Sequence, residues 1–361
     1  MPSAPEPRGA RARGDRALVI APSWVGDAIL SEPLIARLRE SGMTAPIDVV
    51  APPWCGPVYA RMRGVGRIVD APAGHGRFAL AARRRLGLEL REARYTHAYV
   101  LPNTWKSALV PFFARIPHRV GFVGEARYGL LTDARRLDAR AMPQLVTRYA
   151  SLASPRDAPA PAAIAPVLMP DAANRAAAIA ALGLAREGPV AILCPGAEFG
   201  PAKRWPAEHF AALARLLARD GHALWILGSP NDRPVAAALL AALGETDPGL
   251  IDLTDLTGRT DLGTAIDLMS AASLVVSNDS GLMHAAAAVG APLVALFGSS
   301  SPAYTPPLSP KARIARIDIV CSPCFKRQCP LGHFRCMREL TPQLVYNLAR
   351  SEGADASRPA R

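Results

Sequence analysis

The chain has 361 residues, half of them hydrophobic, and its 42 Lys+Arg against 30 Asp+Glu give a formal net charge of +12 at pH 7. This length and hydrophobic content suggest two domains of ordinary size, each with a core of its own. No run approaches the roughly 20 apolar residues that a membrane helix needs, so the sequence predicts no bilayer-spanning segment.

The first residues, 1–14, are rich in Pro, Ala and Arg. They lack the apolar centre of a secretory signal, so we expect a disordered tail and a cytoplasmic protein. The segment 15–160 then alternates short apolar runs with helical patterns, which predicts a parallel, doubly wound sheet. Its strands are expected at 17–21, 47–51, 68–70, 97–101 and 119–122, and its first helix at 28–40.

A polar turn at 22–27 separates the first strand from the first helix. Gly26 lets the backbone turn closely, and Asp27 follows at the start of the helix. A carboxylate at this edge of a parallel sheet can accept a proton from an attacking hydroxyl. It can also merely complement the positive end of the helix, which is worth about 0.3–1 kcal/mol. The local pattern alone favours this second interpretation.

Pro and Ala dominate the stretch before residue 170, and we place an interdomain linker at 161–175. The segment 176–350 repeats the alternation of strands and helices, and a polar tail, 351–361, follows it. The second domain is therefore expected to be Rossmann-like as well. Its strands are expected at 190–194, 223–227, 249–253, 274–276 and 293–297, and its last helix at 342–350.

A basic loop, residues 194–206, follows the first strand of the second domain. Lys203 near its end can reach a diphosphate as a compact point charge. The alternative is an ordinary loop with a solvated pair, Lys203 and Arg204. A binding role for this loop is favoured because a second polar turn is expected at the same edge of the same sheet.

That second turn lies between an apolar run and an alanine-rich run and contains Asp279, Ser280, Gly281 and His284. Such a turn lies at the carboxyl end of a strand, where the unpaired N–H groups of a helix favour an anion. An N-cap and a core histidine would explain one polar residue but not four. The turn therefore predicts a site for a sugar and a diphosphate, as in a transferase that uses a nucleotide-diphosphate sugar.

Four cysteines near the end of the chain have the spacing C-x2-C-x4-C-x6-C, with His333 among them. In a cytosolic chain this is no disulfide framework, but a structural zinc site is one interpretation. Reduced cysteines that pack a Pro-rich loop are the other, and the sequence assigns no metal. The cysteines are Cys321, Cys324, Cys329 and Cys336.

The segment 77–140 is densely basic, with 13 Lys+Arg against 5 Asp+Glu. The simplest interpretation is a solvated face of arginines, and the alternative is a surface for an acidic partner. A nucleic-acid partner is not expected, because only 6% of the residues are aromatic and no recognition helix is visible.

Several of these motifs together resemble glycosyltransferase family 9, the lipopolysaccharide heptosyltransferases, over about residues 16–348. The stretch 324–333 with Cys336 is most like the subgroup that adds the second heptose. The motifs shared with the whole family are Trp24-Val25-Gly26-Asp27, Pro195-Gly196-Ala197, Lys203-Arg204-Trp205-Pro206 and 278–284.

The resemblance implies a GT-B fold, in which two Rossmann-like domains face each other across a cleft. The first domain would bind the acceptor and the second the ADP-sugar. The implied reaction moves L-glycero-D-manno-heptose from ADP-heptose to the first heptose of the lipopolysaccharide inner core, forming an α-1,3 link with inversion. Asp27 falls on the family's proposed base, and Lys203 on its diphosphate-contacting lysine. The donor loop would comprise Asp279, Ser280, Gly281 and His284.

No Asp-x-Asp site is apparent, so we expect a metal-independent enzyme in which Lys203, His284 and a helix N-terminus stabilise the departing ADP. The acceptor would be an anionic glycolipid, with contact to the inner-membrane surface. Transfer to Kdo or to a later core sugar remains open, as do a sugar-nucleotide epimerase and a non-catalytic ADP-sugar-binding protein.

Overall fold

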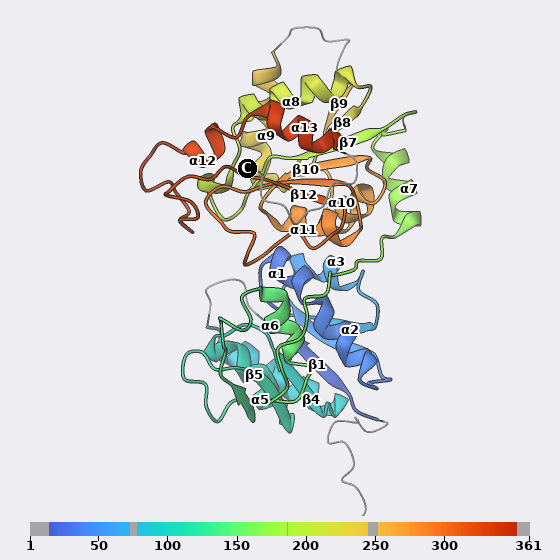
Figure 1. Cartoon of the computed structure of the whole chain (residues 1–361). Helices are drawn as coiled ribbons and strands as arrows, with labels where there is room; N and C mark the ends of the chain where they lie inside the picture. The colour runs from blue at the N-terminus through green and yellow to red at the C-terminus, as the bar shows by residue number, and fades with distance from the viewer. Residues whose placement is uncertain (1–13, 73–77, 186, 245–251, 352–361) are drawn as a thin grey trace, which may run out of the picture. The chain divides into compact units, whose positions relative to one another are not determined.

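The computed structural model describes residues 14–72, 78–185, 187–244 and 252–351, and the chain divides into two units, Met1–Pro166 and Val167–Arg361 (Figure 1). The division falls inside the stretch where the linker is expected. Helix α7 (Ala172–Ala181) occupies the end of that stretch, and Asp171 caps it by accepting hydrogen bonds from two backbone N–H groups. Apart from one residue each, the two predicted tails lie outside the described residues.

Unit 1 contains a six-stranded parallel sheet in the order β3-β2-β1-β4-β5-β6. The predicted doubly wound sheet is therefore confirmed, with a sixth strand that the sequence analysis missed. That strand is three residues long and only partly buried, so it lacks an apolar run. The strands are β1 (Ala17–Ile20), β2 (Ile47–Ala51), β3 (Val65–Asp70), β4 (His97–Val100), β5 (His118–Phe122) and β6 (Asp133–Arg135).

The helices of unit 1 cover the sheet, and the single helix expected at 28–40 is two helices that meet at Ser31. The Ser31 hydroxyl donates to the Ala28 carbonyl at 2.6 Å. Pro33, in the first turn of the second helix, has no N–H with which to continue the ladder. The helices are α1 (Val25–Leu30), α2 (Glu32–Glu40), α3 (Gly56–Tyr59), α4 (Leu80–Glu89), α5 (Leu109–Phe113) and α6 (Leu145–Ser151).

Unit 2 contains a second six-stranded parallel sheet in the order β12-β11-β10-β7-β8-β9. The strand expected at 249–253 falls largely outside the described residues, and β9 begins at its last position. The last strand, β12, was not predicted. The strands are β7 (Val190–Cys194), β8 (Ala223–Ile226), β9 (Leu253–Asp255), β10 (Leu274–Asn278), β11 (Leu293–Leu296) and β12 (Ala312–Ala315).

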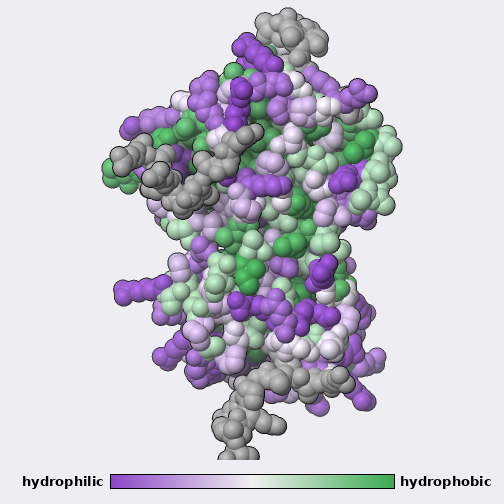
Figure 2. All heavy atoms as spheres, turned by 45° about the vertical axis from the view of Figure 1, so that its right-hand side comes forward, coloured by the Kyte–Doolittle hydropathy of each residue, from purple (hydrophilic) through white to green (hydrophobic). Residues whose placement is uncertain are grey.

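Unit 2 has its own core, in which Trp205 and Phe210 pack with Val345 of the last helix. Among the described residues, no helix combines the length and the apolar character that crossing a membrane requires. In the lower part of Figure 2, hydrophilic side chains project from the surface of unit 1. The helices are α8 (Ala207–Arg219), α9 (Arg233–Leu243), α10 (Leu262–Met269), α11 (Gly281–Ala288), α12 (Arg335–Arg338) and α13 (Pro342–Arg350).

Each sheet has one point at which the chain reverses the direction in which it adds strands. In unit 1 this point lies between β1 and β4, and in unit 2 between β7 and β10. Parallel sheets bind ligands just outside the carboxyl ends of the two strands at such a point. The predicted motifs follow β1, β7 and β10, so the fold places all of them where ligands bind.

Candidate active site

An ion pair joins the two predicted motifs of unit 2. The Lys203 ammonium lies 2.5 Å from the Asp279 carboxylate, although Lys203 follows β7 and Asp279 follows β10. The side chains are 17% and 4% exposed, so the pair is largely shielded from water. The Ser300 hydroxyl, from the loop after β11, donates to the same carboxylate oxygen. Three loops thus meet at one carboxylate.

Asn278, the last residue of β10, fixes the loops around this pair. Its side chain is fully buried, its Oδ1 accepts from the Trp205 N–H at 3.1 Å, and its Nδ2 donates to the Pro195 carbonyl at 2.7 Å. One amide therefore satisfies backbone groups at both ends of the Lys203 loop. Trp205 is held a second time, because its indole N–H donates to the Leu340 carbonyl at 2.7 Å.

The other predicted donor residues lie at the start of α11. Ser280 is its N-cap residue, in extended conformation, and Gly281 is its first residue. His284 is 6% exposed, and burial lowers its pKa to about 4, with the nearby Lys203 charge acting in the same direction and Asp279 opposing it. The imidazole is therefore neutral at pH 7, so it can form hydrogen bonds with a ligand but adds no charge.

Asp27 lies in the first turn of α1, just beyond the carboxyl end of β1, and it is partly exposed. Gly26 also lies inside this helix, so the chain turns before it, at Ser23 and Trp24. The indole of Trp54 holds this turn by donating to the Ser23 carbonyl at 2.9 Å. Burial raises the pKa of the neighbouring Cys55 thiol to about 12, and the Asp27 charge adds to the shift.

A buried arginine shapes the same edge of unit 1. Arg127 is fully buried, and its guanidinium donates to the Pro102 carbonyl at 2.5 Å, the Phe122 carbonyl at 2.6 Å and the Ser107 hydroxyl at 3.0 Å. It joins the loops after β4 and β5, and burial lowers its pKa to about 10. The expectation that the basic segment forms only a solvated face is therefore wrong for Arg127, and also for the buried Arg83.

The cysteine-rich segment, residues 321–336, packs against the loops of the unit 2 site. The Phe325 N–H donates to the Ser299 carbonyl at 2.7 Å, and the Ala202 N–H donates to the Arg327 carbonyl at 3.0 Å. The Ser322 hydroxyl donates to the Gly298 carbonyl at 2.6 Å. The segment thus contacts both the Lys203 loop and the loop that carries Ser300.

The four thiols of this segment and His333 line one small cavity of about 20 Å³, together with Ala202 and Ser299. The Phe334 N–H donates to Cys329 Sγ at 3.4 Å and lowers the pKa of that thiol, whereas burial raises the pKa of Cys336. Within the described parts of the chain, no group of three His, Cys, Asp or Glu side chains is arranged to hold a metal ion.

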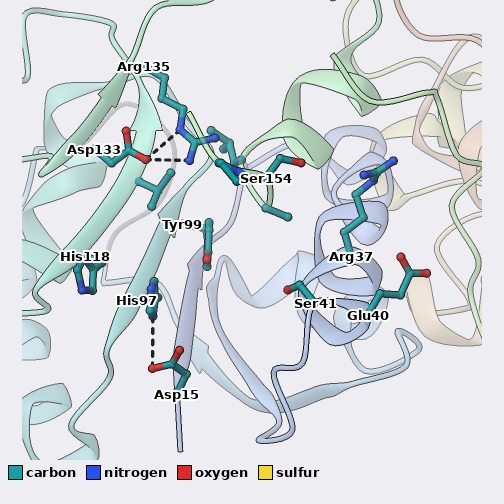
Figure 3. Close-up of a pocket in the computed structure, with 14 residues that line it drawn as sticks. Asp15, Arg37, Glu40, Ser41, His97, Tyr99, His118, Asp133, Arg135 and Ser154 are labelled. Atoms are coloured by element: carbon teal, nitrogen blue, oxygen red, sulfur yellow. Dashed lines mark hydrogen bonds and ion pairs between the residues drawn. The ribbon is translucent and has the colours of Figure 1, made fainter. Parts of the chain in front are cut away.

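A larger cavity, of about 620 Å³, lies in unit 1 but contains none of the predicted site residues (Figure 3). His97 and His118 open β4 and β5, and their rings stack with centroids 4.7 Å apart. Asp15 Oδ1 lies 4.0 Å from His97 Nδ1 on the same side of the pocket. These residues mark the amino ends of the strands, so the cavity is away from the edge where the motifs lie.

The structure therefore brings Lys203, Asp279, Ser280, Gly281 and His284 together at one edge of unit 2, and it places Gly26 and Asp27 at the corresponding edge of unit 1. The sequence analysis gave no role to Asn278 or Ser300. Asn278 stands inside the motif 278–284 and Ser300 lies in the loop after β11, but only the fold shows that they contact the Lys203 loop and Asp279. The arrangement suits an anionic ligand held by a cation, helix N–H groups and a neutral imidazole.

Comparison with known proteins gives consistent matches. The model of the family described as glycosyltransferase family 9 (heptosyltransferase) matches residues 83–335. Lipopolysaccharide heptosyltransferase 2 of Salmonella typhimurium is 44% identical over 347 residues, which are 93% of this chain and 99% of the relative. The protein of the same name from Escherichia coli K12 is 45% identical over 335 residues, 91% of this chain and 95% of the relative.

A solved structure agrees with these matches. The E. coli ADP-heptose lipopolysaccharide heptosyltransferase II has a TM-score of 0.82 and 42% identity to this chain, and the match covers 92% of this chain and 97% of that one. The family model covers most of the described sequence, and the relatives match nearly end to end. The chain is therefore a glycosyltransferase and belongs to family 9, the heptosyltransferases.

Proposed function

We propose that this enzyme transfers heptose from ADP-heptose to the first heptose of the lipopolysaccharide inner core. The observation that carries the proposal is the pair of Lys203 and Asp279 at the reversal point of unit 2, beside the N-terminus of α11. A diphosphate suits this position, because an ammonium and unpaired helix N–H groups converge there. Relatives at 44–45% identity that carry the name lipopolysaccharide heptosyltransferase 2 support heptose as the sugar and lipopolysaccharide as the acceptor.

We assign Asp27 as the general base in an inverting, single-step displacement that forms an α-1,3 link. The base takes the proton of the acceptor hydroxyl while ADP leaves from the opposite face of the sugar. Asp27 belongs to unit 1 and Lys203 to unit 2, in keeping with separate binding of acceptor and donor. The leaving group gains negative charge, which Lys203 and the N–H groups of α11 would stabilise without a metal ion.

The test is ADP release from ADP-heptose in the presence of EDTA, with an acceptor that ends in one heptose and a control acceptor that ends in Kdo. Turnover on the first acceptor alone supports the proposal and the metal-independent mechanism. Turnover on the Kdo acceptor would support heptose transfer from ADP-heptose but would make Kdo, and not the first heptose, the acceptor. ADP-heptose binding without turnover on either acceptor would contradict the proposed acceptor.

The Asp27→Asn variant tests the base. It keeps the size of the side chain but cannot accept the proton, so turnover should fall by about 10²–10⁴-fold while ADP-heptose affinity stays unchanged. Glu32, the first residue of α2, is the next carboxylate along the chain and is buried, so Glu32→Gln serves as a matched carboxylate control. Wild-type turnover by Asp27→Asn would remove Asp27 from the mechanism.

We also propose that unit 1 contacts an anionic membrane surface, since the acceptor is anchored in lipid. Phe78, Leu80, Trp105 and Phe112 are each 39–49% exposed, and the rings of Phe78 and Trp105 stack with centroids 5.9 Å apart. They lie on or beside α4 and α5, where arginines are dense. Aromatic side chains and arginines together suit the interface of an anionic bilayer.

Sedimentation with vesicles tests this contact. Vesicles with phosphatidylglycerol should bind the protein more strongly than phosphatidylcholine vesicles, and Phe112→Ser should weaken the binding. Leu240→Ser, which changes an exposed apolar residue of unit 2, should not. Equal binding by Phe112→Ser and wild type would show that Phe112 does not take part in the membrane contact.

A further inference from the structure

The charged groups at the unit 2 site leave a diphosphate without enough positive charge. The Lys203 ammonium is already paired with the Asp279 carboxylate at 2.5 Å, so the two charges largely cancel. His284 is neutral at pH 7, because burial lowers its pKa to about 4. The N-terminus of α11 contributes about half an elementary charge. The diphosphate of an ADP-sugar carries more negative charge than these groups offset.

The guanidinium of Arg204, next to Lys203, donates to the Ala197 carbonyl at 3.4 Å within its own loop. Arg327 brings a further cation beside Lys203. Both cations lie near the ring of Phe199, with Lys203 Nζ 4.9 Å and Arg327 Cζ 5.4 Å from its centroid. Among the residues that the structure describes, no carboxylate pairs with the Arg327 guanidinium, and the side chain is exposed. The guanidinium contacts the face of the Phe199 ring, which occupies none of its hydrogen-bond donors.

The backbone holds Arg327 in this place. Its carbonyl accepts from the Ala202 N–H at 3.0 Å, one residue before Lys203. Gly200 lets the two segments approach: its φ is +150°, and a Cβ at this position would lie 2.6 Å from the Arg327 carbonyl oxygen. The position of Arg327 is therefore fixed by main-chain contacts, which a change of its side chain leaves intact.

We propose that the Arg327 guanidinium binds the diphosphate of the nucleotide sugar as a second cation beside Lys203. This inference rests on the proposed function, because it takes an ADP-sugar as the ligand. A guanidinium has a planar set of donors that matches phosphate oxygens in pairs, and it stays charged at any pH of interest. It also stabilises the charge that develops on ADP as the sugar–oxygen bond breaks.

The experiment measures ADP and AMP affinity by calorimetry for the wild type, Arg327→Ala and Arg327→Lys. Hydrogen bonds to charged groups contribute about 1.5–3 kcal/mol, so Arg327→Ala should bind ADP roughly 10- to 100-fold more weakly. AMP lacks the second phosphate, and its affinity should change less than that of ADP. Arg327→Lys restores the charge without the planar donors and should recover part of the affinity.

Arg338→Ala is the matched control, because Arg338 is exposed on the neighbouring α12 and its guanidinium lies over the Phe334 ring. It should bind ADP like the wild type. If the wild type binds ADP and Arg327→Ala binds it equally well, the inference about Arg327 is wrong while the donor assignment stands. If the wild type binds neither nucleotide, the proposed function fails, and the role of Arg327 fails with it.

Discussion

Removal of Lys203 should affect stability and donor binding by separable routes. Lys203→Ala leaves the Asp279 carboxylate, 4% exposed, without its cation and with the Ser300 hydroxyl still donating to it. Breaking a buried ion pair from one side costs roughly 3–5 kcal/mol. Because Lys203 is itself 17% exposed and Ser300 remains, we expect the lower end, about 3 kcal/mol.

A double variant separates the two effects. Lys203→Met combined with Asp279→Asn removes both charges at similar volume, so no uncompensated charge stays buried and most of the lost stability should return. ADP binding should not return, because the cation is still absent. The free energy of unfolding from urea titration and the ADP affinity from calorimetry are the two measurements.

Lys311→Ala is the control, because Lys311 is an exposed lysine of the same unit. It should match the wild type in both assays. Wild-type stability of Lys203→Ala would show that Asp279 does not depend on this cation. Wild-type ADP affinity of the double variant would show that Lys203 does not contact the diphosphate.

Two further predictions concern buried titratable groups. His284 has a folded-state pKa of about 4, below its unfolded value near 6.5, so its contribution to stability is present above pH 6.5 and is lost as the pH falls toward 4. His284→Gln should reduce that loss by up to about 3 kcal/mol between pH 7 and 4, measured by urea titration at each pH; an unchanged pH profile would contradict the burial argument. Arg127→Met leaves several loop carbonyls without a donor and should cost about 3–5 kcal/mol. A loss below about 1 kcal/mol would mean that water replaces the guanidinium.

Apolar runs predicted the central strands well, because a strand covered on both faces is continuously hydrophobic. The run at 190–194 became β7 without a change of bounds, and the last helix was also predicted at its observed position, 342–350. Two of the four edge strands, β6 and β12, were missed. An edge strand has a neighbouring strand on one side only, and Asp133 and Arg313 interrupt the apolar pattern in β6 and β12.

Site residues were predicted where a sequence motif indicates a loop, and they were missed where their contacts depend on the fold. Asp279 and Lys203 were both named, but their ion pair joins positions 76 residues apart. No local sequence pattern marks Arg127, because the sequence around an arginine that binds backbone carbonyls does not differ from that around a solvated arginine. Arg327 belongs to the same class, because its position depends on a main-chain contact with Ala202.

The cysteine-rich segment gives the enzyme a chemical reporter beside its donor loops. Cys329 is partly exposed, and its lowered pKa increases the fraction of reactive thiolate at neutral pH. The same segment is tied to the Lys203 loop through Ala202 and to the following loop through Ser299. An electrophilic label on this thiol would therefore sense any rearrangement of those loops. The rate of alkylation, followed with and without nucleotide, would read out occupancy of the site without any acceptor or turnover.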